Sequence, residues 1–202
     1  MMNFKKTTLA VLAGTLLSGG VWAATDGSLG STSSGTTDID FTVSGGPGAG
    51  GSILIDKLDD ISLGTFNADS PAAGLQGFSN FCVYKTGSPS GFDFNLTTTS
   101  GKGVTNFELH KDGVATPTEY QKVKYAVSFS SDDNNGVNGT ELTNKKVEPV
   151  SADESVGLVI ENNTYTCSGE NVSILVTANL ATASTAEAGT YKDTLTLLVA
   201  PR

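Results

Sequence analysis

Short segments in which apolar and polar residues alternate recur along this chain, and they constrain its fold more than any other feature. In the clearest of them, Val123, Tyr125, Val127 and Phe129 alternate with small or charged residues. A period of two places the apolar side chains on one face of a β-strand. We predict strands at residues 53–56, 61–66, 81–85, 92–97, 107–110, 123–129, 156–160, 172–177 and 191–200. Turn residues separate them, which predicts an all-β protein, an antiparallel β-sandwich.

The first 23 residues have the pattern of a secretory signal peptide. Lys5 and Lys6 precede a short apolar run, and Val21-Trp22-Ala23 fits the small-residue rule for cleavage. The run is too short to span a bilayer. We therefore expect residues 1–23 to be removed and the protein to be exported.

The remaining chain is strongly acidic. Two of the 12 Lys and Arg residues and none of the 21 Asp and Glu residues lie in the signal, which leaves 10 basic residues against 21 acidic ones, a formal charge of −11. Such a charge argues against nucleic acid or an anionic lipid surface as the partner.

Cys82 and Cys167 are the two cysteines of the chain. In an exported protein they most simply form one disulfide, which closes a long loop and stabilises the fold by about 4–5 kcal/mol in the chain-entropy model. Two buried free thiols are the alternative. A zinc site is a weaker interpretation, because the single His110 is a poor third ligand. We expect no metal or other cofactor.

Residues 24–52 form an extension ahead of a sandwich domain at residues 53–202. Within the extension, Ile39, Phe41 and Val43 alternate with polar residues, and a glycine-rich hinge follows at residues 44–52. The alternating segment, Asp38–Val43, is therefore either a strand that can be donated to another molecule or the ordinary first strand of a complete sandwich.

The last predicted strand runs almost to the C-terminus, with Leu195, Leu197 and Val199 on one face. No later strand follows that could cover its edge, and an uncovered edge recruits strands from other molecules. This feature makes assembly the first function to consider.

Three stretches resemble the archaic chaperone–usher pilus subunits, a group that shares a domain family with spore coat protein U. They are Gly30–Val43, Leu58–Phe66 leading to Phe81-Cys-Val-Tyr84, and Thr166-Cys-Ser-Gly169 continuing to Ala188–Pro201. The resemblance implies an incomplete immunoglobulin-like sandwich that lacks its final strand. It also implies that a periplasmic chaperone fills the groove first, and that the N-terminal extension of the next subunit then replaces it at an outer-membrane usher.

Under this resemblance, Ile39, Phe41 and Val43 are the donor residues, and Leu195, Leu197 and Val199 border the acceptor groove. The leading hypothesis is a secreted structural subunit of a surface fimbria or pilus, which passes through the periplasm to the cell surface and supports adhesion or biofilm. The alternative is a stand-alone secreted binding module that is complemented by its own N-terminal strand.

Catalysis has little support in the sequence, and we expect no enzyme activity. Ser131–Glu141 is rich in oxygen ligands but fails the spacing of an EF-hand, so we interpret it as a hairpin loop. We expect Tyr191 to be a corner tyrosine whose hydroxyl holds a loop. His110, beside Lys111 and Asp112, is interpreted as a solvated surface residue at a turn.

Overall fold

The computed structural model describes residues 30, 32–37, 51–67, 75–88 and 90–202, and these residues are almost entirely strands and turns. The strands are β1 (Ser33–Thr37), β2 (Ile53–Asp56), β3 (Gln76–Lys85), β4 (Phe92–Ser100), β5 (Phe107–Lys111), β6 (Lys122–Ser130), β7 (Thr140–Glu141), β8 (Val147–Ala152), β9 (Leu158–Glu161), β10 (Thr164–Cys167), β11 (Val172–Ala178), β12 (Tyr191–Lys192) and β13 (Leu195–Pro201). Two single turns of helix occur at η1 (Glu119–Gln121) and α1 (Leu180–Ala183).

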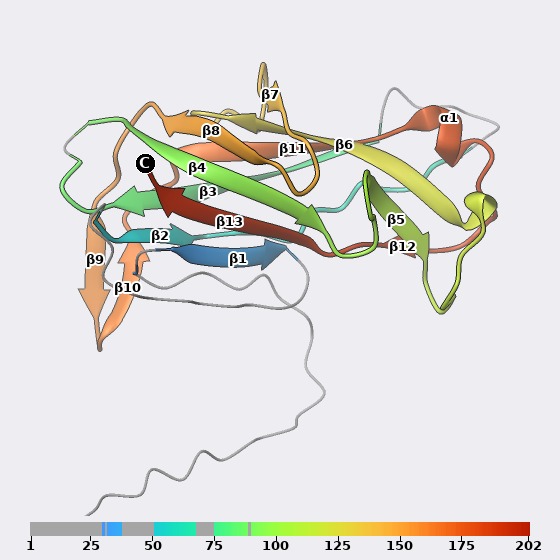
Figure 1. Ribbon diagram of the computed structural model, residues 1–202, viewed down its shortest axis with the longest axis horizontal. Coiled ribbons are helices and arrows are strands. Elements are labelled where there is room, and N and C mark those ends of the chain that lie inside the picture. Colours follow the sequence, from blue (N-terminus) through green and yellow to red (C-terminus); the bar gives the residue numbers. More distant parts are fainter. Residues whose placement is uncertain (1–29, 31, 38–50, 68–74, 89) are drawn as a thin grey trace, which may run out of the picture.

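The strands form two main sheets that face each other (Figure 1). The smaller sheet has the order β1-β13-β4-β8, and the larger has the order β12-β5-β6-β11-β3-β2, with β7 paired to β6. A separate hairpin, β9–β10, projects from one end. Every pairing among the described strands is antiparallel. The prediction of an all-β antiparallel sandwich is confirmed.

The core lies between the two sheets and follows the alternation seen in the sequence. On β4, Phe92, Phe94 and Leu96 are buried while the residues between them are more exposed. Phe94 meets Phe129 of β6 edge to face, with ring centroids 5.9 Å apart. Because such contacts join one sheet to the other, the apolar alternation determines which face of each sheet is inside.

One end of the sandwich is held by the predicted disulfide. Cys82 on β3 is bonded to Cys167 on β10, and both are buried together with Leu54. The Cys167 amide also donates to the buried carboxylate of Asp56 at 2.5 Å. These contacts attach the projecting β9–β10 hairpin to the larger sheet.

Residues 57–67 were predicted to contain a strand at 61–66, and the structure shows that this prediction is wrong. The segment, called here the strap, carries no assigned strand. Its alternation reflects burial instead: Ile61 and Leu63 pack against the main core and Phe66 against a second apolar cluster. The strap passes so close to β3 that a Cβ on Gly77 would lie 2.6 Å from the carbonyl oxygen of Ser62. Glycine at this position makes the crossing possible.

The predicted strand at residues 191–200 is divided in two. β12 pairs with β5 in the larger sheet, and β13 pairs with β4 in the smaller one. The chain therefore passes from one sheet to the other at Asp193 and Thr194. The Gly101 amide donates to the Thr194 carbonyl at 2.8 Å, which fixes this crossing against the end of β4.

Candidate functional site

The segment at residues 30–37 also passes between the two sheets, along one long side of the sandwich. Gly30 exchanges two backbone hydrogen bonds with Ile53, at 2.7 and 3.3 Å. Three residues later, β1 begins its antiparallel pairing with β13, with Ser33 opposite Val199 and Thr37 opposite Leu195. Figure 1 shows β1 along the lower edge of the sandwich in this view, below β2 and the C-terminal strand. The segment closes the sandwich where the resemblance places a groove.

β1 fills this position with small polar residues. Its sequence is Ser-Ser-Gly-Thr-Thr, and both Ser33 and Ser34 are buried. The Ser33 hydroxyl accepts a hydrogen bond from the Ile55 amide at 3.3 Å. β1 therefore supplies backbone pairing to β13 but no large apolar side chain to the core.

The residues predicted to border the groove all face inward. Leu195 is 5 % exposed, and Leu197 and Val199 are fully buried. β13 lies between β4 and β1, so over this length it is an interior strand, where the sequence suggested an uncovered edge. The predicted donor residues Ile39, Phe41 and Val43 lie outside the described residues, as does the predicted signal peptide.

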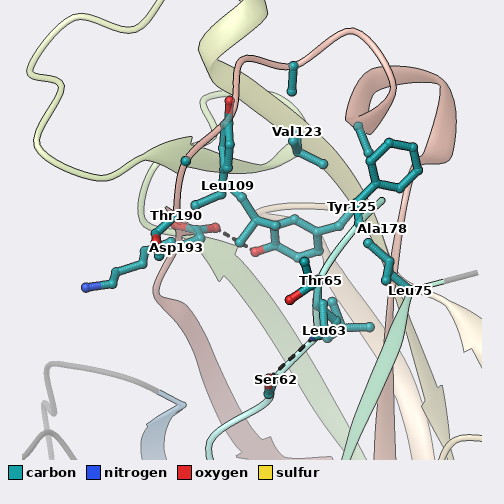
Figure 2. Close-up of a pocket in the computed structure, with 18 of the residues that line it drawn as sticks. Ser62, Leu63, Thr65, Leu75, Leu109, Val123, Tyr125, Ala178, Thr190 and Asp193 are labelled. Carbon is teal, nitrogen blue, oxygen red and sulfur yellow. Dashed lines mark hydrogen bonds between the residues drawn. The ribbon is translucent and has the colours of Figure 1, made fainter. Parts of the chain in front are cut away.

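A cavity of about 830 Å³ lies at the Leu195 end of β13. It is bounded by the strap on one side and by the inner face of β5, β6 and β11 on the other, as Figure 2 shows. Most of the side chains that line it are apolar; they include Leu63, Phe66, Leu109, Val123, Val176 and Leu195. This cavity has no counterpart among the predicted features, because the strap that covers it has the alternating sequence of a strand.

A polar cluster stands among these apolar residues, centred on Asp193. One carboxylate oxygen, Oδ2, accepts hydrogen bonds from the hydroxyls of Tyr125 at 2.6 Å and Ser100 at 2.5 Å. The other, Oδ1, accepts from the Lys102 amide at 2.8 Å. The cluster joins the sheet crossing before β13 to the end of β4 and to β6. Figure 2 shows Tyr125 reaching across the cavity wall toward Asp193.

Burial governs the protonation of this cluster. It raises the pKa of the Asp193 carboxyl above its usual range, although the hydrogen bonds from Ser100 and Tyr125 act in the opposite direction. Burial, followed by the negative charge of Asp193, raises the pKa of Tyr125, which therefore stays a neutral hydrogen-bond donor. Asp193 is thus a carboxyl that becomes easier to protonate as water is excluded from it.

The other residues singled out in the sequence have structural surroundings. The Tyr191 hydroxyl donates to the Glu187 carbonyl at 2.7 Å, which confirms that it holds a loop. His110 lies within β5, its side chain is 16 % exposed, and its Nε2 is 3.4 Å from Glu108 Oε2. The interpretation of His110 as a solvated turn residue is therefore wrong, because the strand extends one residue further than predicted.

The described residues contain no group of three or more His, Cys, Asp or Glu side chains placed to hold a metal ion. In the loop after β6, Asp132 accepts hydrogen bonds from the Ser130 hydroxyl and the Asn134 amide, so its carboxylate shapes the turn. No helix in the described part of the chain is long and apolar enough to cross a membrane.

Comparison with known proteins gives no match to a family model, to a curated protein or to a solved structure.

Proposed function

We propose that this protein is an exported structural subunit of a surface fimbria, and that its copies join head to tail by donating a β-strand. The archaic chaperone–usher pilus subunits that the sequence resembles provide the model. By the same resemblance, a periplasmic chaperone and an outer-membrane usher are the expected assembly partners. The observation that carries the proposal is that the pairing of β1 with β13 ends at Leu195, which lines the apolar cavity.

The pairing of β1 with the C-terminal segment could be extended beyond Thr37 without a change of register. Residues of β1 with odd numbers, such as Ser33 and Thr37, stand opposite the inward-facing Val199 and Leu195. Because side chains alternate along a strand, a continued strand would turn its next odd-numbered residues to the same inner face. In that extension, Ile39 would stand opposite Asp193, Phe41 opposite Tyr191 and Val43 opposite Gly189. These are the apolar residues of the predicted donor segment, and their counterparts line the cavity.

The energetics favour such an extended strand over β1 alone. β1 pairs Ser33, Gly35 and Thr37 with the inward-facing Val199, Leu197 and Leu195 of β13. Burying one large apolar side chain contributes roughly 1.5–3 kcal/mol. Three of them entering an apolar cavity would therefore add several kcal/mol to the backbone pairing, which is the balance expected for strand addition.

The length of the hinge favours a donor from another molecule. Gly30 is paired with Ile53, so a strand that ran from residue 30 to Val43 in its present register would end about 43 Å from Gly30, at about 3.3 Å per residue. The ten residue steps from Val43 back to Ile53 span at most about 33–36 Å. The chain could place Val43 in its own cavity, while keeping both its register and the Gly30–Ile53 pairing, only with this linker pulled almost straight. A second copy has no such restriction.

A second candidate function is the self-complemented secreted binding module. The observation that favours it is that β1 of the same chain already occupies the side of β13. In this case Asp38–Val43 would have no role in assembly, and the protein would remain a single molecule.

The test is the substitution Phe41→Asp, with Thr42→Asp as a matched control of equal charge on the opposite face of the segment. The proposal predicts that the wild-type protein and Thr42→Asp form detergent-resistant multimers that collapse to monomer on heating, and that Phe41→Asp abolishes them. Mass measurement of unheated samples gives the result. Multimers that persist in Phe41→Asp, or a wild-type protein that is only monomeric, would contradict the proposal.

A further inference from the structure

The carboxyl of Asp193 is unusual among the acidic groups around the cavity, because its hydrogen-bond partners are uncharged. They are the hydroxyls of Ser100 and Tyr125 and the backbone amide of Lys102. The Lys102 side chain is exposed to water, and several charges on the neighbouring elements pair with other groups. Lys111 of β5 binds Glu187 at 2.8 Å, Lys192 of β12 binds Asp112 at 2.9 Å, and Glu108 of β5 lies 3.4 Å from His110. Asp60 of the strap is exposed to water.

Asp193 lines the cavity over which, under the proposed function, a donated strand would lie. In the continued register its counterpart is Ile39, and directly opposite residues of an antiparallel pair have Cβ atoms about 4.5–5.5 Å apart. An isoleucine at that distance replaces water beside the carboxyl with hydrocarbon. Burying an ionised carboxylate without a cation is costly, and the cost is avoided when the carboxyl takes up a proton.

We propose that docking of a donor strand over the cavity is coupled to protonation of Asp193, so that the strand binds more tightly in mildly acidic solution than at neutral pH. This inference rests on the proposed function, since it concerns the same strand-docking site. The proton comes from solvent and stays on the Asp193 carboxyl while the strand is docked. Tyr125 and Ser100 keep their own protons and remain hydrogen-bonded to Asp193.

Proton linkage determines whether the affinity for the strand rises or falls with pH. Docking excludes water and raises the pKa of Asp193 further, so the docked state binds more protons than the open state. The affinity for the strand therefore falls as the pH rises through the range between the two pKa values, and it is constant above and below that range. Each unit by which docking raises the pKa gives about a tenfold change in affinity across the range.

The experiment measures the binding of a fluorescent peptide with the sequence of residues 33–43, acetylated at its N-terminus, to the full-length protein. The peptide must displace β1, and fluorescence anisotropy reports its capture. Titrations at pH 5 to pH 8 and constant ionic strength give the dissociation constant at each pH. We expect about three- to tenfold tighter binding at pH 5 than at pH 8.

Two variants assign the effect to Asp193. Asp193→Asn, which cannot ionise, should bind the peptide equally well at both ends of the range. Tyr125→Phe removes one hydrogen bond from the carboxylate, so the change in affinity should move to higher pH. Glu108→Gln removes a nearby carboxyl that faces His110, and it should behave like the wild type. If Asp193→Asn does not fold, as judged by circular dichroism, the shift in Tyr125→Phe decides.

A dissociation constant that does not depend on pH in the wild type would overturn this inference and leave the proposed function intact. The same holds if Asp193→Asn keeps the pH dependence, or if a folded Tyr125→Phe shows no shift. By contrast, failure of the peptide to bind at any pH would count against the proposed function itself.

Discussion

The two strands that pair with β13, β4 and β1, differ in the side chains that they bring to the core. On one side, β4 pairs with all of Leu195–Pro201 and brings Phe94 and Leu96 into the core. On the other side, β1 pairs with only five residues and brings serine, glycine and threonine. The backbone pairing is of the same kind on both sides, so the side chains make the difference. The β4 side holds β13 through buried aromatic and aliphatic side chains, whereas the β1 side holds it through backbone pairing and small residues, as the proposed exchange of strands would require.

The largest effect is expected on the β4 side. Phe94→Ala removes a fully buried ring that contacts Phe129, and it should lower the free energy of unfolding by about 3–5 kcal/mol. Urea denaturation followed by circular dichroism measures the change. As a control, Leu198→Ala truncates a half-exposed side chain on the outer face of β13 and should cost far less. Equal losses in the two variants would show that the inner face of this sheet does not carry the stability.

An intermediate effect is expected for hydrogen exchange along β13 itself. Amides of successive residues in an interior strand point alternately to its two neighbours. Amides that point to β1 should exchange at least about tenfold faster than those that point to β4, because β1 can detach locally without unfolding the core. Exchange resolved by residue in NMR spectra tests this directly. Uniform protection along β13 would mean that β1 is as permanent a neighbour as β4.

The smallest effect is expected on the β1 side. Ser33→Ala removes the hydroxyl that accepts from the buried Ile55 amide, and it should cost about 1–2 kcal/mol. The same urea measurement applies. A loss comparable to that of Phe94→Ala would break the comparison, since β1 would then be part of the folding core.

Sequence alone was sufficient where alternation and burial coincide. Strands β4, β6 and β11 were predicted to within a few residues, because most of their alternating apolar residues face the main core. Strand β2, which is buried at all four residues, was predicted with its observed ends. The disulfide was likewise predicted correctly. β8 was missed because it contains Pro149 and Glu148, which are tolerated at the edge of a sheet and carry no apolar pattern.

The candidate site was predictable only in part. The inward face of β13 follows from its alternating leucines, but β1 has a composition that is also typical of an unfolded tail. The cluster at Asp193 joins Ser100, Tyr125 and Asp193, which lie far apart in the sequence and come together only when the chain passes between the sheets. No local pattern encodes such a meeting, so the cavity and its buried carboxyl had to come from the structure.

The disulfide has a mechanical consequence for a fibre of the proposed kind. Tension would enter the subunit through its N-terminal segment ahead of β2 and leave through β13, where the next donor strand is held. Cys82 and Cys167 lie on this route, so the covalent bond between them carries the load past the 85 residues of the loop. That loop, which would extend by about 290 Å if pulled out straight, cannot be drawn out of the subunit while the disulfide remains intact.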